Sequence, residues 1–244
     1  MPLNPLLDEP FAAFRGLPAR AWFSTRAGGV SLPPFHSLNL AYLTADDREN
    51  VTENRRRVAA ELSLNPDELV IGRQVHGGEV HALEDVEQGV TPGDAIVISR
   101  PGTAAMVVAA DCLPLVFYDS VGHRGAVAHA GWRGLAAGVI ANTINALESL
   151  GSSAGNLIVG VGPAIHACCY EVGPEVIGAL GAARAEYSTG RGDRAFLDLV
   201  AVAARQLDRT GVAGSRIADA GICTRCNNGL FFSARAGEPT GRFA

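Results

Sequence analysis

The sequence predicts a mixed α/β or α+β fold in one domain. Short apolar runs follow one another through the middle of the chain, a pattern typical of strands buried on both faces of a sheet. Longer segments carry apolar residues at helical spacing. Strands outnumber helices and alternate with them irregularly, which argues against a regular doubly wound sheet. No linker rich in Pro or Ser divides the 244 residues, so we expect a single domain over residues 1–244.

The order of these patterns predicts individual elements. A helix over 46–62 begins with acidic residues, which suit a helix N-terminus. The segments 131–150 and 194–209 each place apolar residues on one stripe, and 174–180 is a shorter helix. The predicted strands are 19–24, 70–75, 79–83, 95–98, 104–109, 115–118, 125–129 and 157–161.

Composition and charge exclude several classes of protein. Hydrophobic residues make up 48% of the chain and charged residues 18%, as in ordinary globular proteins. The net charge of −5 gives no broad basic surface, so nucleic acid is not an expected partner. The longest apolar stretch, 103–118, contains Asp111 and Pro114 and is too short to span a bilayer, so no membrane partner is expected.

The N-terminus and the cysteines indicate the cytoplasm. The first residues have no basic start and include Asp8 and Glu9, unlike a signal peptide. The cysteine count is five. An odd count without a signal peptide favours reduced thiols and a cytoplasmic location.

Three residues with metal-binding side chains stand where apolar runs stop. His76, Cys112 and His129 each follow such a run, with Gly or Pro close behind. Two imidazoles and a thiolate suit zinc, and three protein ligands leave a fourth position open, as in catalytic sites. Their separations match no short metal motif, so packing in the core is the alternative interpretation.

The other cysteines form two pairs in the sequence. Cys223 and Cys226 have the Cys-x-x-Cys spacing of half a zinc ribbon or of a redox pair. No second pair has that spacing, and Cys168 is followed directly by Cys169. We interpret both pairs as structural packing, with Cys168 and Cys169 in a buried, inert turn.

Several longer motifs carry a resemblance to a known family. HAGWRG (129–134) after ADCLP (110–114) is the most specific combination. Together these motifs resemble the YfiH-like family of polyphenol oxidoreductase or laccase-domain proteins over nearly the whole chain. The others include STRAGGVS (24–31), QVHG (74–77), GDA (93–95), GPAIHACCYEVG (162–173), ICTRC (222–226) and FFSAR (231–235).

The resemblance implies a fold and an activity. The fold would be a four-layer αββα sandwich with two mixed sheets. The zinc ligands would be His76, Cys112 and His129. The activity would be that of a purine nucleoside phosphorylase and adenosine deaminase, acting on adenosine, inosine, guanosine or methylthioadenosine with phosphate. Separately, we expect a monomer or small homo-oligomer. His166 and Ala234 depart from the family pattern, which has a small residue and an aromatic residue there.

Copper oxidase chemistry is disfavoured despite the laccase label. A multicopper oxidase needs many histidine ligands, usually in His-x-His pairs. The chain has six histidines, and none is two residues from another. We therefore expect zinc rather than copper.

Five further side chains are candidates for contact with the substrate or with the three ligands. Arg55 and Arg133 can grip phosphate bidentately. Asp111 can orient a ligand or accept a proton, and Asn39 and Gln74 can hydrogen-bond the base or the ribose. Zinc lowers the pKa of water from about 15.7 to about 7, which suits deamination.

Two other functions use the same residues. Cys112 can be a nucleophile with His129 as its base, in an amide hydrolase that corrects, for instance, peptidoglycan precursors. Alternatively, the zinc is structural and the chain is a non-enzymatic zinc-binding module. Three ligands with an open position favour an enzyme, because structural zinc sites are normally closed by four protein ligands.

Overall fold

The computed structural model describes residues 7–8 and 11–244 of the chain. The expectation that the N-terminus is no signal peptide falls mainly on residues 1–10, most of which lie outside the described part. None of the described helices is both long and apolar enough to cross a membrane.

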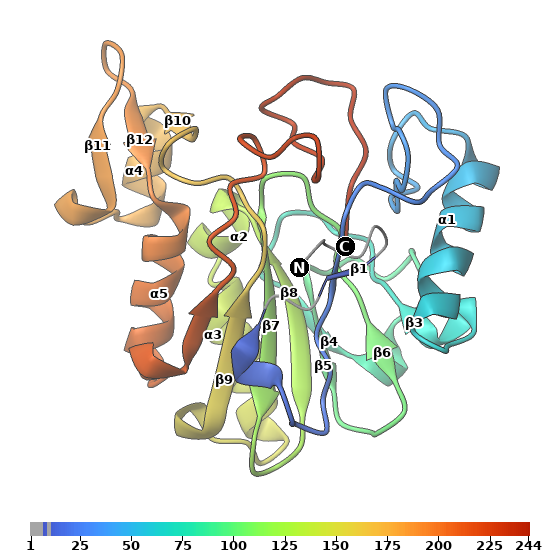
Figure 1. Cartoon of the computed structure of the whole chain (residues 1–244). Helices are drawn as coiled ribbons and strands as arrows, with labels where there is room; N and C mark the ends of the chain where they lie inside the picture. The colour runs from blue at the N-terminus through green and yellow to red at the C-terminus, as the bar shows by residue number, and fades with distance from the viewer. Residues whose placement is uncertain (1–6, 9–10) are drawn as a thin grey trace.

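A six-stranded mixed sheet forms the centre of the molecule (Figure 1). Its strand order is β13-β9-β7-β8-β5-β4. β4 pairs with β5, and β9 with β13, in parallel, whereas the three pairings between them are antiparallel. The strands are β4 (Val80–Ala82), β5 (Ala95–Ile98), β7 (Leu113–Asp119), β8 (Gly125–Ala130), β9 (Leu157–Val161) and β13 (Ile217–Asp219).

Short strands form three further sheets. β1 (Leu7–Asp8) pairs with β2 (Phe23–Ser24), and β3 (Leu69–Val70) pairs with β6 (Ala104–Ala105). The third sheet has the order β10-β12-β11, from β10 (Glu171–Val172), β11 (Tyr187–Thr189) and β12 (Ala195–Leu197). The mixed α/β architecture is thus confirmed, but the described residues form one large sheet and three small ones instead of two continuous mixed sheets.

The predicted strands 19–24, 70–75 and 104–109 are short for a specific reason. Their backbone groups bond to the C-terminal segment and to side chains as well as to neighbouring strands. Ser24 N donates to Ala244 O at 2.8 Å, and Ala109 N donates to Phe243 O at 2.8 Å. The side-chain amide of Gln74 bonds both the N–H and the C=O of Val108.

The helices of the described chain are α1 (Arg48–Glu61), α2 (Trp132–Ala136), α3 (Val139–Ser149), α4 (Pro174–Leu180) and α5 (Leu199–Arg209). The predicted helix over 131–150 is divided, because Gly138 adopts φ +78° and ends the helical path between α2 and α3. The predicted helix over 194–209 begins late, because residues 195–197 are β12. Asp198 then accepts a hydrogen bond from Ala201 N and caps α5.

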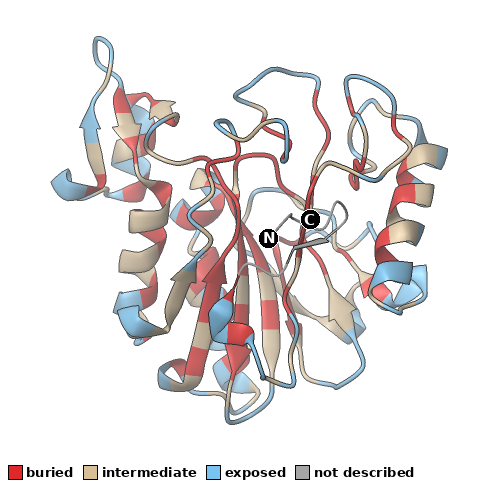
Figure 2. Cartoon of the chain, in the orientation of Figure 1, coloured by how far each residue is buried: buried red, intermediate tan, exposed pale blue. Residues whose placement is uncertain are grey.

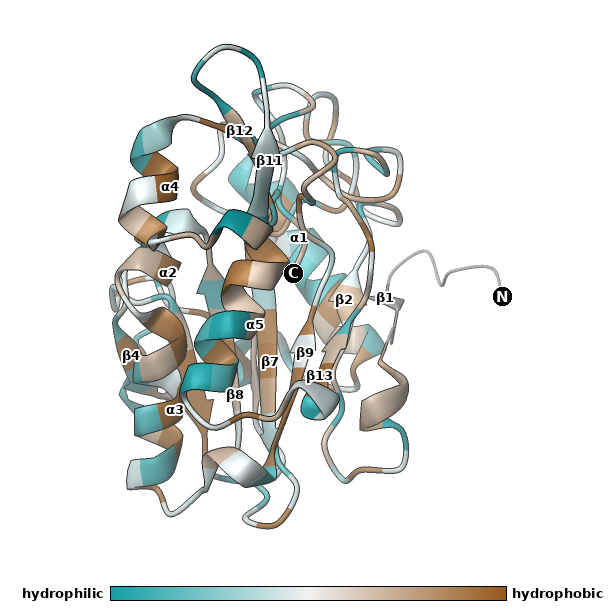
Figure 3. Cartoon of the chain, turned by 90° about the vertical axis from the view of Figure 1, so that its left-hand side faces the viewer, coloured by the Kyte–Doolittle hydropathy of each residue, from teal (hydrophilic) through white to brown (hydrophobic). Residues whose placement is uncertain are grey.

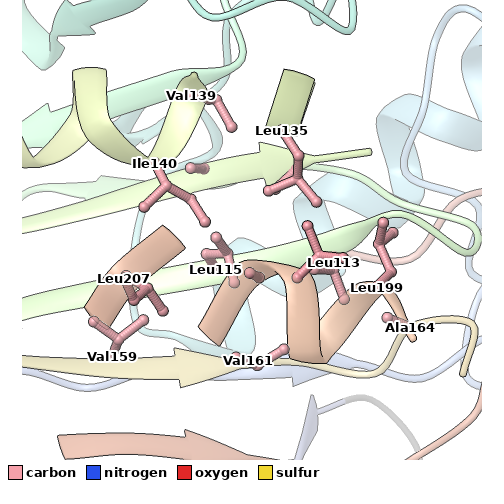
Figure 4. Close-up of a cluster of buried hydrophobic side chains, with 14 of the residues drawn as sticks. Leu113, Leu115, Leu135, Val139, Ile140, Val159, Val161, Ala164, Leu199 and Leu207 are labelled. Atoms are coloured by element: carbon pink, nitrogen blue, oxygen red, sulfur yellow. The ribbon is translucent and has the colours of Figure 1, made fainter. Parts of the chain in front are cut away.

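The largest hydrophobic core lies between the central sheet and helices α3 and α5. Figure 3 shows these helices on one side of the sheet and the segment with β1 and β2 on the other. Alternate residues of β7, Leu113 and Leu115, point into this core with Ile140 and Leu207 (Figure 4), and all four are fully buried. The strands β5, β7 and β9 are correspondingly buried along most of their length (Figure 2).

One edge of the sheet collects segments from the whole chain. The pairings place the beginnings of β4, β5 and β7 beside the ends of β8, β9 and β13. Helix α2 and the β10–β12 unit lie toward this edge (Figure 1). Loops that are distant in the sequence therefore meet there.

We expect Leu115→Ala to lower the free energy of unfolding by about 2–5 kcal/mol, because Leu115 is 0% exposed and its loss leaves a cavity. Urea denaturation measures the change. Val121→Ala is the matched control, since Val121 is 68% exposed in the turn between β7 and β8; we expect a change within about 0.5 kcal/mol. Equal effects of the two substitutions would contradict this assignment of the core.

Candidate active site

His76, Cys112 and His129 converge at the sheet edge. His76 lies in the turn before β4, Cys112 directly precedes β7, and His129 is near the end of β8. One ligand atom from each lies within 4.8 Å of the others. The His76 and His129 rings meet edge to face, with centroids 4.8 Å apart. This cluster can hold a metal ion, with His129 buried, Cys112 half-buried and His76 exposed.

The buried carboxylate of Asp94 fixes the orientation of His129. Asp94 is 0% exposed, and its Oδ1 lies 2.8 Å from His129 Nδ1. Burial raises the pKa of Asp94, but hydrogen bonds from His129, Gly77 and Val75 outweigh burial and hold it below its usual value. The carboxylate therefore accepts the Nδ1 proton and leaves Nε2 as the metal-binding atom.

The same carboxylate holds the turn that carries His76. The backbone N–H groups of Val75, His76 and Gly77 all donate to Asp94, at 2.8–3.0 Å. His76 adopts φ +60°, a left-handed conformation that is uncommon for residues other than Gly. Three successive N–H groups directed at one anion form a nest that stabilises this turn.

The pKa values of Cys112 and His129 are shifted in opposite directions. Burial by itself raises the pKa of the Cys112 thiol, but the charges and hydrogen bonds of His129 and His76 lower it to about 6. Burial likewise opposes a charge on His129, yet Cys112 and Asp94 raise its pKa to about 9. These shifts favour the thiolate of Cys112, which is the form that would bind a metal ion, and a metal ion would replace the proton on the His129 imidazole.

Close packing shapes the space around the thiolate. A Cβ atom at Gly131 would lie 2.6 Å from Cys112 Sγ and 3.4 Å from the His76 ring. Only glycine fits at this position without displacing a ligand, so the HAGWRG motif supplies both His129 and the clearance for Cys112.

The predicted substrate contacts are distributed unevenly. Asp111 is buried beside Cys112 and accepts hydrogen bonds from Thr224 Oγ1 at 2.6 Å and Arg235 N at 2.8 Å. Arg133 is exposed on α2, two residues after Gly131, and stacks over the Trp132 ring at 4.3 Å. Gln74 lies two residues before His76, with its amide bonded to Val108.

Asn39 and Arg55 make their contacts away from the three ligands. Asn39 is 0% exposed, and its amide bonds Thr44, Asp46, Ala41 and Arg242. The Arg55 guanidinium bonds Leu40 O and stacks over Tyr42 at 4.1 Å, and burial lowers its pKa to about 10. Direct contact of either side chain with substrate stays a prediction.

Three residues that the sequence did not single out belong to this neighbourhood. Asp94 is one, and its signal is an acid directly before the buried strand β5. Burial, followed by the negative charge of Cys112, raises the pKa of Tyr170 to about 12, while Arg235 and Arg133 oppose this rise. Arg235 stacks over the Tyr170 ring at 4.9 Å. Tyr170 and Arg235 thus join Arg133 near the thiolate.

A cavity of about 620 Å³ lies elsewhere. Its walls include Trp22, Phe23, Met106 and Tyr118, and none of His76, Cys112 and His129 lines it. It lies on the sheet face opposite α3 and α5 and is not part of the candidate site.

The four remaining cysteines are arranged differently from the prediction. Cys168, Cys169, Cys223 and Cys226 form a second group whose sulfur atoms all lie within 4.8 Å of one another. Cys168 is exposed, so the prediction that this turn is buried is wrong. The two pairs come from the turns after β9 and β13, which neighbour each other only because those strands pair in parallel.

We expect Asp94→Asn to weaken metal binding at the His76–Cys112–His129 cluster by about 10- to 100-fold, because His129 and the His76 turn lose their common acceptor. Competition with a chelator measures the affinity, and the metal lost in Cys112→Ala identifies this site. Asp119→Asn is the matched control, since Asp119 is 1% exposed and accepts N–H groups of Val121 and Gly122 in the turn after β7. Unchanged affinity in Asp94→Asn would exclude the role assigned to Asp94.

The chain is similar to known proteins over most of its length. It is 42% identical over 230 residues to a purine nucleoside phosphorylase of Pseudomonas aeruginosa, covering 92% of this chain and 91% of that relative. It is 40% identical over 224 residues to purine nucleoside phosphorylase YfiH of Escherichia coli, covering 91% and 90%. The crystal structure of YlmD from Geobacillus stearothermophilus superposes with a TM-score of 0.89 at 31% identity, covering 97% and 92%. A family model described as multi-copper polyphenol oxidoreductase laccase matches residues 20–244, and the chain belongs to this family.

Proposed function

We propose that this chain is a zinc-dependent enzyme that phosphorolyses purine nucleosides and deaminates adenosine. The observation that carries the proposal is the convergence of one thiolate and two imidazoles at the sheet edge, with Asp94 orienting His129. Zinc suits this donor set, and three protein ligands leave a position open. The substrate class is supported by relatives that are named purine nucleoside phosphorylases and align over more than nine-tenths of the chain.

The ligands and their partners have separate tasks in this proposal. A zinc ion would supply a Lewis acid and lower the pKa of water, which suits attack on the aminated carbon of adenosine. Asp94 keeps His129 in one tautomer by accepting the Nδ1 proton. Exposed His76 lies on the open side of the cluster, where a nucleoside can approach.

Phosphorolysis also requires an anion site and support for the leaving purine. Arg133 and Arg235 are the exposed cations whose charges act on Tyr170 beside the thiolate. Guanidinium groups bind phosphate oxygens bidentately. Tyr170 keeps its proton at neutral pH because its pKa is about 12, so its hydroxyl can donate to phosphate or to substrate. The acceptor oxygens of Asp111 are engaged by Thr224 and Arg235, and we assign Asp111 to positioning Cys112 and Arg235.

An amide hydrolase with Cys112 as nucleophile is the second candidate. The lowered pKa of Cys112 and the raised pKa of His129 favour it, since a thiolate beside an imidazolium is an activated nucleophile. Metal dependence separates the two functions. Full activity of the metal-free protein would support the hydrolase and exclude the zinc enzyme.

We expect the purified protein to release free base and ribose 1-phosphate from adenosine or inosine only when phosphate is present. Cys112→Ala removes a ligand and should abolish this release. Chelator should do the same to the wild type, and added zinc should restore activity. High-performance liquid chromatography of the bases measures the reaction.

Val121→Ala, which changes an exposed residue in the turn between β7 and β8, outside both cysteine clusters, controls for substitution as such. Release of base by Cys112→Ala at the wild-type rate would refute the proposal. Conversion of adenosine to inosine without phosphate tests the deaminase reaction separately in the same samples.

Replacing a cation should weaken the use of phosphate specifically. We expect Arg133→Met or Arg235→Met to raise the KM for phosphate about tenfold or more, because a hydrogen bond to a charged group contributes about 1.5–3 kcal/mol. Initial rates at varied phosphate concentrations measure it. Arg209→Met on the last turn of α5 is the matched control. An unchanged phosphate KM in both site variants would exclude these arginines as the anion site.

A further inference from the structure

Four cysteines outside the candidate active site form a compact group. Cys168 and Cys169 lie after β9, and Cys223 and Cys226 lie after β13. All four are free thiols, and their sulfur atoms lie within 4.8 Å of one another. The sulfur of Cys168 is 3.7 Å from those of Cys169 and Cys226, and the sulfurs of Cys169 and Cys226 are 3.4 Å apart.

These distances fit one tetrahedral metal ion. With zinc–sulfur bonds of about 2.3 Å, the sulfurs of a tetrahedral site lie about 3.8 Å apart. Disulfide sulfurs are bonded at about 2.05 Å. Iron–sulfur clusters distribute four cysteine sulfurs over two or four iron atoms, and therefore place some of them farther apart.

The backbone around Cys223 is arranged for a thiolate ligand. Its sulfur accepts N–H groups from Cys226 and His166. An N–H of the second cysteine directed at the first sulfur accompanies the Cys-x-x-Cys spacing of structural zinc sites.

We propose that Cys168, Cys169, Cys223 and Cys226 bind one zinc ion in a closed, structural site, separate from the His76–Cys112–His129 cluster. Four protein ligands leave no position for substrate, so this ion is not catalytic. The proposal is independent of the nucleoside reaction.

The four cysteines lie on two segments that both donate hydrogen bonds to Asp111. Ile165, before Cys168, donates its N–H to Asp111 O at 2.9 Å. Thr224, after Cys223, donates its hydroxyl to Asp111 Oδ1 at 2.6 Å. Asp111 directly precedes Cys112 and adopts φ +90°. A zinc ion that joins the two segments would therefore stabilise the backbone that presents Cys112.

Metal analysis tests the proposal on the full chain, purified with reductant and zinc and without chelator. We expect about two zinc ions per wild-type chain and about one in Cys226→Ser, in Cys168→Ser and in the matched control Cys112→Ala. Cys168 and Cys226 are exposed, so their replacement by serine leaves the core unchanged. Circular dichroism checks that each variant folds.

Cobalt identifies the ligands of each ion. Cobalt-loaded Cys112→Ala should keep the strong sulfur-to-metal absorption of a four-thiolate site, and Cys112→Ala/Cys226→Ser should lose it. One zinc ion per wild-type chain that disappears in Cys112→Ala but persists in Cys226→Ser would overturn the proposal. So would a disulfide among the four cysteines, seen as a mass lower by two hydrogen atoms, in protein without the second zinc. Because the count needs no turnover, failure of the phosphorylase assay leaves this result unaffected.

Discussion

The carboxylate of Asp94 joins the parts of the candidate active site. It is fully buried, it meets His129 Nδ1, and it accepts three backbone N–H groups from the turn that carries His76. Asp94 also pairs through its backbone, because its C=O accepts the N–H of His129 at 2.7 Å. A buried carboxylate is costly unless it is fully hydrogen-bonded. The groups that donate these hydrogen bonds are the His129 ring and the turn around His76. Both must be held in place for His76 and His129 to bind one metal ion.

The topology of the central sheet explains why distant residues meet. β7 and β8 are antiparallel neighbours, so the start of one and the end of the other lie at one edge. That places Cys112 beside His129. β9 and β13 are parallel and end at the same edge, which brings the turns with Cys168 and Cys223 together. One edge therefore carries both the His76–Cys112–His129 cluster and the four-cysteine group. Asp111, next to Cys112, is hydrogen-bonded to the segments that carry the four cysteines.

The hydrophobic pattern predicted those elements whose conformation is determined by their own residues. The strands Ala95–Ile98 and Leu157–Val161 and the helix Pro174–Leu180 have the predicted bounds. The strands β10, β11 and β13 were not predicted, because two or three residues carry no measurable alternation. The break at Gly138 depends on a single positive φ inside an otherwise helical pattern.

The candidate site was predictable only in part, for a related reason. His76, Cys112 and His129 were visible as polar stops after apolar runs, and the family motifs connected them. Asp94 and the four-cysteine group depend on strand order, which local pattern does not encode. Spacing along the chain could not show that a Cys-Cys pair and a Cys-x-x-Cys pair come from parallel neighbours.

Two residues of the candidate site, the ligand His76 and the neighbour of Cys112, have strained backbone conformations. His76 and Asp111 both adopt positive φ, at +60° and +90°, and such conformations cost about 1–3 kcal/mol each at residues other than Gly. Glycine would relieve the strain but would remove the imidazole of His76 and the carboxylate of Asp111. Hydrogen bonds from the N–H groups of the first turn to the Asp94 carboxylate offset the cost at His76. Hydrogen bonds to Asp111 from Thr224, Ile165 and Arg235 offset it at the second position. Both strained residues thus keep side chains that the site requires, and the surrounding hydrogen bonds hold them in that conformation.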